Sequence, residues 1–94
     1  MASANGQIES VTDCGDLVTD VRVSELTDAP RDDRIKVECE GHVTQGIYES
    51  KDGQPPMTFI AFENEDGRLQ ISITEGDASG FLGIRVGASV KVSW

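Results

Sequence analysis

Few residues of this 94-residue chain have the types and spacing that catalytic or metal chemistry needs. The cysteines, Cys14 and Cys39, form no Cys-x-x-Cys pair, and the single histidine is His42. A structural zinc site needs about four such ligands, so we expect no metal site. The sequence holds no phosphate-binding loop, nucleophile elbow or His-Glu-x-x-His motif. It therefore predicts no enzyme activity and no cofactor.

The charge of the chain is strongly acidic. Asp and Glu number 17 and Lys and Arg 8, giving a net charge of −9. Such a balance counts against binding a polyanion, because phosphate contacts need cations. A surface rich in Asp and poor in Lys suits high salt, where charge repulsion is screened. The composition indicates either a halophilic origin or an acidic protein of good solubility.

The sequence also bears on the cellular location. The longest unbroken apolar run, residues 59–62, is too short for a transmembrane helix. The N-terminus lacks the basic and apolar regions of a secretory signal. Cys39 lies at an inward position of a strand pattern, which favours a reduced core thiol, although a disulfide with Cys14 stays open. Together these features predict a cytoplasmic protein.

The elements that would position any site are mostly strands. Val and Ile total 16 residues against four Leu, and β-branched residues favour sheets. Period-two alternation predicts a long bent strand over 34–48, a hairpin with strands at 57–63 and 68–74, and a last strand over 88–94. Asp77 could cap one helical turn. The expected core comprises Ile35, Val37, Val43, Ile60, Phe62, Leu69, Ile71, Ile73, Leu82, Val90 and Val92.

The chain thus reads as all-β, a small OB-like β-barrel with a flexible N-terminal arm. We assign residues 1–20 to the arm, which could supply an extra strand, and residues 21–94 to the barrel domain. Residues 1–7, MASANGQ, are small and polar, which is typical of a flexible segment.

Several short motifs resemble the OB domains of archaeal replication protein A. They are VRVSEL at 21–26, VECEGHV at 37–43, NEDGRLQISI at 64–73, ASGFLG at 78–83 and GASVKVSW at 87–94. The resemblance covers residues 21–94 and implies a module that binds single-stranded DNA or RNA through aromatic platforms and a basic groove. The residues that it implies for this interface are Tyr48, Lys51, Arg68, Gln70, Arg34 and Lys36.

The sequence departs from that family because no fifth strand follows GASVKVSW. An unpaired edge is a template for further pairing. We therefore expect the N-terminal segment or a partner's strand to pair with the last strand, through an interface that includes Ala88, Val90, Val92 and Trp94.

Two other classes of function stay open. One is a structural or assembly protein, such as a virion decoration, head-completion or other oligomer-forming barrel, located in the virion. The other is an acidic protein-binding adaptor or inhibitor. The expected partner is accordingly single-stranded nucleic acid, another protein or further copies of the chain in a homo-oligomer, and no membrane.

Overall fold

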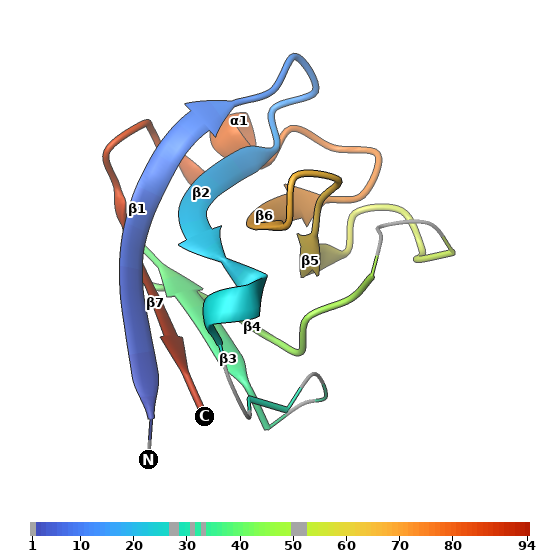
Figure 1. Ribbon diagram of the computed structural model, residues 1–94. Helices are drawn as coiled ribbons and strands as arrows, with labels where there is room; N and C mark the ends of the chain where they lie inside the picture. The colour runs from blue at the N-terminus through green and yellow to red at the C-terminus, as the bar shows by residue number, and fades with distance from the viewer. Residues whose placement is uncertain (1, 27–28, 31, 33, 50–52) are drawn as a thin grey trace.

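The computed structural model describes residues 2–26, 29–30, 32, 34–49 and 53–94, and these build one antiparallel sheet that curls into a barrel (Figure 1). Its order is β4-β3-β7-β1-β2-β6-β5. The strands are β1 (Ser3–Val11), β2 (Leu17–Arg22), β3 (Lys36–Cys39), β4 (His42–Gln45), β5 (Phe59–Glu63), β6 (Arg68–Ile73) and β7 (Ser89–Ser93). A 3-10 turn, η1 (Val23–Glu25), follows β2, and a short helix, α1 (Ala78–Leu82), precedes β7. The all-β prediction is confirmed.

The barrel is nearly closed, because the two outermost strands of the order, β4 and β5, approach each other. The Thr44 hydroxyl donates to the Phe59 carbonyl at 3.1 Å. Beyond β4 the chain crosses to β5, where Tyr48 forms an isolated parallel bridge with Phe62. Its amide donates to the Ala61 carbonyl at 3.0 Å, and its carbonyl accepts from the Glu63 amide at 2.9 Å.

The N-terminal segment supplies the strand that completes the sheet. β1 pairs with β7 from Ser3↔Ser93 to Gln7↔Ser89 and continues alongside β2. The expectation that this segment pairs with the last strand is therefore confirmed within one chain. The prediction of a flexible N-terminal arm is wrong from Ser3 onward, because the residues from Ser3 to Val11 form strand β1.

The edge of the last strand is thus filled by the N-terminal segment of the same chain rather than by a partner's strand. β7 lies between β3 and β1, so the chain itself pairs with both of its edges. Val90 and Val92 are buried, and Ala88 and Trp94 pack partly against the core.

The predicted strand over 34–48 is instead a hairpin. Glu40 and Gly41 have φ values of 51° and 85°, the left-handed pair that a two-residue hairpin turn requires. The turn sets the pairs Cys39↔His42, Glu38↔Val43 and Val37↔Thr44. Val43 therefore lies on the outer face of the sheet with Glu38 and is 47% exposed. The prediction that Val43 belongs to the core is wrong.

The interior of the barrel is filled by apolar residues from six of the seven strands of the sheet, from η1 and from α1 and its flanking loops. The core cluster contains seven predicted residues: Ile35, Val37, Leu69, Ile71, Ile73, Val90 and Val92. Leu82 packs partly against it. Ile60 and Phe62 are buried as predicted, but they lie outside this cluster. Sequence reasoning missed Ile8, Leu17, Val21, Val23 and Ile84, which β1, β2, η1 and the loop after α1 contribute.

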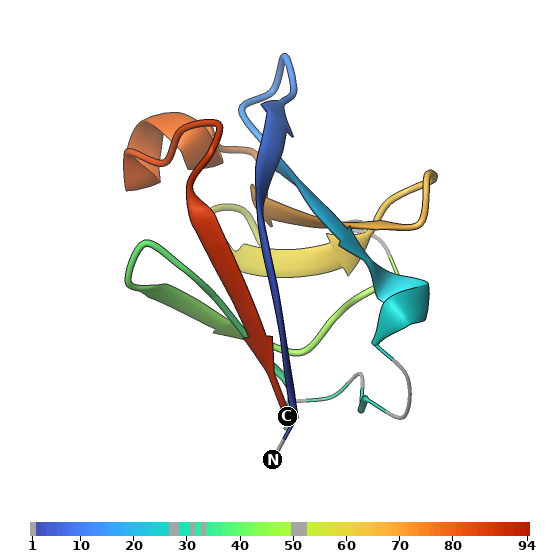
Figure 2. The same ribbon diagram turned by 60° about the vertical axis from the view of Figure 1, so that its left-hand side comes forward.

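Two local predictions are confirmed, the β5–β6 hairpin and the cap of α1, and α1 lies at the end of the barrel away from the termini (Figure 2). The hairpin of β5 and β6 pairs Phe59 with Ile73 and Glu63 with Leu69. The Asp77 carboxylate caps α1 by accepting from the Gly80 amide at 2.9 Å. Across the part of the chain that the structure describes, no helix has the length and apolar character needed to cross a membrane.

Candidate functional site

The residues implied for a nucleic-acid interface do not form one surface. Lys36 lies on β3 and Arg68 on β6, and three strands separate these in the sheet order. Tyr48 is 39% exposed, but its backbone takes part in closing the barrel. Lys51 lies outside the described residues.

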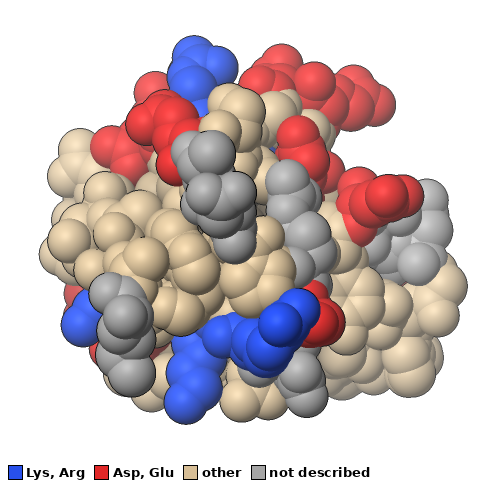
Figure 3. All heavy atoms as spheres, turned by 60° about the horizontal axis from the view of Figure 1, so that its bottom comes forward, with Lys and Arg blue, Asp and Glu red and all other residues tan. Residues whose placement is uncertain are grey.

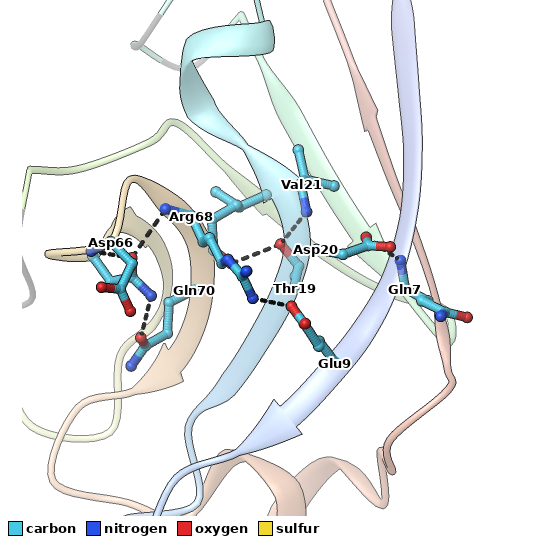
Figure 4. Close-up of polar contacts among 10 residues, drawn as sticks. Gln7, Glu9, Thr19, Asp20, Val21, Asp66, Arg68 and Gln70 are labelled. Atoms are coloured by element: carbon cyan, nitrogen blue, oxygen red, sulfur yellow. Dashed lines mark hydrogen bonds and ion pairs between the residues drawn. The ribbon is translucent and has the colours of Figure 1, made fainter.

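Two of the cations among them have acidic partners. Arg68 points across β2 and forms an ion pair with Glu9 of β1 (Figure 4). Arg34 forms a forked ion pair with Asp32, whose pKa is lowered by hydrogen bonds from the Arg34 side chain. Arg34 and Lys36 line a cleft of about 260 Å³ with Ser93 and Trp94.

The face shown in Figure 3 separates the two signs of charge only in part. Several of its Lys and Arg side chains gather along the lower side and most Asp and Glu lie along the upper side, but each side also holds side chains of the other sign. Among the described residues of this face, no continuous basic groove runs across it. The arrangement lacks the track of cations that single-stranded nucleic acid needs.

A buried polar cluster lies instead on the outer face of β6. The Asp16 side chain belongs to a residue only 2% exposed, and its two oxygens accept separate hydrogen bonds. The Ser72 hydroxyl donates to Oδ1 at 2.7 Å, and the Gln70 amide nitrogen donates to Oδ2 at 2.9 Å. Because a buried charge is costly without such partners, these contacts hold the carboxylate in place.

Strand alternation places Gln70 and Ser72 on this face. Leu69, Ile71 and Ile73 point into the core cluster, so the residues between them point the other way. The pairs Ile60↔Ser72 and Phe62↔Gln70 put two buried apolar side chains of β5 on the same face. The polar cluster therefore has an apolar border that limits its contact with water.

The loop between β1 and β2 places Asp16 on the outer face of β6. The Thr12 carbonyl accepts from the Gly15 amide at 2.9 Å, and the Thr12 hydroxyl accepts from the Asp16 amide at 3.1 Å. The loop packs against α1, because the Ser79 amide donates to the Gly15 carbonyl at 2.9 Å. Gly15 has a φ of 87°, and a Cβ there would lie 1.9 Å from Oδ1 of Asp77. Only glycine fits this contact.

Backbone strain occurs near the same cluster. Met57 and Glu75 are non-glycine residues with φ values of 62° and 55°, a conformation that costs free energy for an L-residue. They are adjacent in space, since the Met57 amide donates to the Thr74 carbonyl at 2.6 Å. Strain of this kind concentrates at functional sites, which supports this end of the barrel as the site.

The cluster places one acidic side chain, Asp16, in hydrogen-bonding contact with two neutral side chains, Ser72 and Gln70. Within the described residues, no group of three or more His, Cys, Asp and Glu could hold a metal ion.

Sequence reasoning found Gln70 but missed Asp16. Alternation along β6 placed Gln70 and Ser72 together on the outer face, yet 56 residues separate Ser72 from Asp16. A lone aspartate between two strand patterns looks like any turn residue. Only the fold reveals that it is buried.

Comparison with known proteins identifies a family. Residues 6–91 match the family model described as the SAM hydroxide adenosyltransferase C-terminal domain. A search of curated proteins finds no relative. This match overturns the resemblance to replication protein A, and with it single-stranded nucleic-acid binding and the virion-protein alternative. The prediction of no enzyme is also wrong, since the family is a domain of SAM-related enzymes.

Two solved structures share the fold. A protein from Thermotoga maritima, described as an uncharacterized conserved protein, has a TM-score of 0.81 and 17% identity, over 98% of this chain and 36% of its own. A conserved hypothetical protein from Thermus thermophilus has a TM-score of 0.75 and 21% identity, over 95% of this chain and 34% of its own. The chain therefore spans about a third of the length of either protein.

Proposed function

Because the chain belongs to the SAM hydroxide adenosyltransferase C-terminal domain family, we propose that it serves as the C-terminal part of such an enzyme and helps to bind S-adenosylmethionine. The family match over residues 6–91 carries this proposal. The family name describes transfer of an adenosyl group to hydroxide. In that reaction the bond from sulfur to the ribose C5′ breaks, a bond from C5′ to oxygen forms, and methionine leaves.

The Asp16 cluster is the part of this domain that we assign to the substrate. S-adenosylmethionine carries a sulfonium and an ammonium, and Asp16 is an acidic side chain positioned by Ser72 and Gln70. The apolar border of Ile60 and Phe62 lowers the local dielectric, which strengthens attraction between opposite charges. The net charge of −9 also favours the approach of a cation.

The remaining catalytic groups belong to other parts of the enzyme in this proposal. The chain covers about a third of the two solved structures, so the rest of such a protein would position the hydroxide. We retain a cytoplasmic location as part of the proposal, because Cys14 and Cys39 are free thiols. A homo-oligomer stays a prediction, to be checked by the mass in solution.

Binding of S-adenosylmethionine to the folded chain tests the proposal. Asp16→Asn keeps the side-chain shape and removes the charge, so the affinity measured by calorimetry should fall about tenfold or more. Asp13→Asn is the matched control, since it makes the same change at an exposed position of the same loop. It should leave the affinity nearly unchanged.

Two results would contradict the proposal. One is the absence of any heat of binding or NMR shift with folded protein at about 1 mM ligand. The other is an equal loss of affinity in both variants, because that would indicate a general charge effect rather than a site at Asp16.

A further inference from the structure

The N-terminal half of β1 is paired along one edge only. β1 pairs with β7 from Ser3 to Gln7, but its pairing with β2 ends at Ile8↔Thr19. From there β2 swings away from β1 towards η1, as Figure 2 shows. Among the residues that the structure describes, no strand therefore pairs with the other edge of β1 between Ser3 and Gln7.

The alternation of this pairing decides which backbone groups of β1 are open. Ala2 exchanges two backbone hydrogen bonds with the residue that follows β7. In an antiparallel pair every second residue repeats this arrangement, so Ala4 and Gly6 also direct their amides and carbonyls at β7. Ser3 and Asn5 direct theirs the opposite way. Both residues are exposed, and these amides and carbonyls have no hydrogen-bond partner among the described residues.

Asp20 ends this open edge at Gln7. Oδ1 of the Asp20 carboxylate takes the place of a strand there, because it accepts from the Gln7 amide at 2.8 Å (Figure 4). The approach requires glycine at position 6, since a Cβ on Gly6 would lie 2.4 Å from Oδ1 of Asp20. Gln7 has thus no amide left for a further strand, and the edge keeps both donors and acceptors at Ser3 and Asn5.

We propose that this edge is an interaction surface for a second copy of the chain, with the two β1 strands antiparallel about a twofold axis at Ala4. In this register Ser3 of each copy faces Asn5 of the other, and each open amide meets an open carbonyl. A twofold interface uses the same patch on both copies, and the donors and acceptors of this patch complement themselves. A register centred on Asn5 would instead bring Ser3 against the occupied amide of Gln7.

The distribution of charge favours a second copy over a basic or an acidic partner segment. Residues 3–8 carry no charge, although the chain as a whole has a net charge of −9. The exposed charges nearest in the sheet are Lys91 on β7 and Lys36 and Glu38 on β3. Two copies therefore meet here without placing acidic side chains opposite each other. Strand edges are commonly protected by charged side chains or proline, and this stretch has neither.

The small size of this interface predicts a weak dimer. A single pair of strands buries less than the roughly 1,200 Å² of a stable interface. The net charge of −9 on each copy opposes association, and salt screens this repulsion. We expect a dissociation constant of about 0.1 mM in about 2 M potassium chloride, and weaker association in about 0.1 M.

Hydrogen exchange of single amides, measured by NMR in molar salt, tests the edge directly. The amides of Ala4 and Gly6 bond to β7 and should exchange slowly at any protein concentration. Those of Ser3 and Asn5 should exchange rapidly in dilute protein and about fourfold more slowly at about 1 mM than at about 20 µM. Sedimentation should show the mass rising towards that of a dimer. Unchanged exchange at Ser3 and Asn5, or the mass of one chain at about 1 mM, would overturn the proposal.

A matched pair of variants isolates the backbone donor. Asn5→Pro removes an amide hydrogen that bonds to nothing within the described chain, so it should abolish the dimer and keep the fold. Asn5→Ala also loses the side chain but keeps this amide hydrogen, so it should still dimerise. Equal association of the two variants would place the contact elsewhere and overturn the proposal.

Two charged double variants test the register without touching the backbone. Ser3→Asp/Asn5→Asp puts like charges face to face across the axis and should weaken the dimer at least tenfold in about 0.1 M salt. Ser3→Lys/Asn5→Asp puts opposite charges face to face and should strengthen it. Equal affinities in the two would overturn the register centred on Ala4. These results do not depend on binding of S-adenosylmethionine, because neither substituted residue belongs to the Asp16 cluster.

Discussion

At the scale of single residues, the alternation of β6 has a measurable energetic consequence. Ile71 is fully buried in the core cluster, while Val43 is 47% exposed. Ile71→Ala should lower the free energy of unfolding by about 2–5 kcal/mol, because it leaves a cavity. Val43→Ala should cost far less, and urea unfolding measures both. Similar losses at the two positions would mean that β4 packs its other face inward.

Burial of Cys39 gives stability a dependence on pH. Desolvation raises the pKa of its thiol from 9.0 to about 11, and the nearby Glu40 carboxylate adds to the shift. Between these values the unfolded thiol loses a proton that the folded thiol keeps, so stability falls as pH rises from about 9 to about 11. Cys39→Ala should flatten this part of the profile of unfolding free energy against pH. An equally steep fall in the variant would assign the dependence to other groups.

At the scale of elements, the contact between the β1–β2 loop and α1 can be isolated with two glycines. Gly15 and Gly41 have φ values of 87° and 85°, so alanine at either position suffers similar backbone strain. Only at Gly15 does the new Cβ collide with Asp77, since nothing lies within 4 Å at Gly41. Gly15→Ala should therefore lower the thermal midpoint more than Gly41→Ala and weaken binding at Asp16. Equal lowering of the two thermal midpoints would show that the β1–β2 loop rearranges around the new Cβ at little cost in stability.

The elements also show what a sequence can and cannot predict here. The β5–β6 hairpin was predictable because alternation and the Asp-Gly signal are local. The β3–β4 hairpin was missed, because its two-residue turn at Glu40 and Gly41 interrupts the pattern without a stretch of loop residues. β1 was only suggested, since its sequence is polar and its pairing with β7 joins the two ends of the chain. The Asp16 site depends on a different long-range pairing, that of β2 with β6, which local patterns do not encode either.

At the scale of the whole molecule, repulsion among acidic groups should control stability. A net charge of −9 on 94 residues opposes the compact state. Potassium chloride raised from about 0.1 M to about 2 M shortens the range of this repulsion, so the thermal midpoint should rise. Sucrose at matched osmolality serves as the uncharged control. A midpoint that stays flat in salt would remove the argument for a halophilic origin.

The meeting of the two ends of the chain makes the barrel almost circular. Ala2 and Trp94 exchange a pair of backbone hydrogen bonds, at 2.8 Å and 2.9 Å, and the termini lie side by side in Figures 1 and 2. A short linker could therefore join them, and the exposed turn at Glu40 and Gly41 could be opened instead. Circular permutation of this kind is tolerated where termini are close. We expect such a permutant to keep the same strand order, as amide NMR would show, so the position of the chain break is not part of what specifies this barrel.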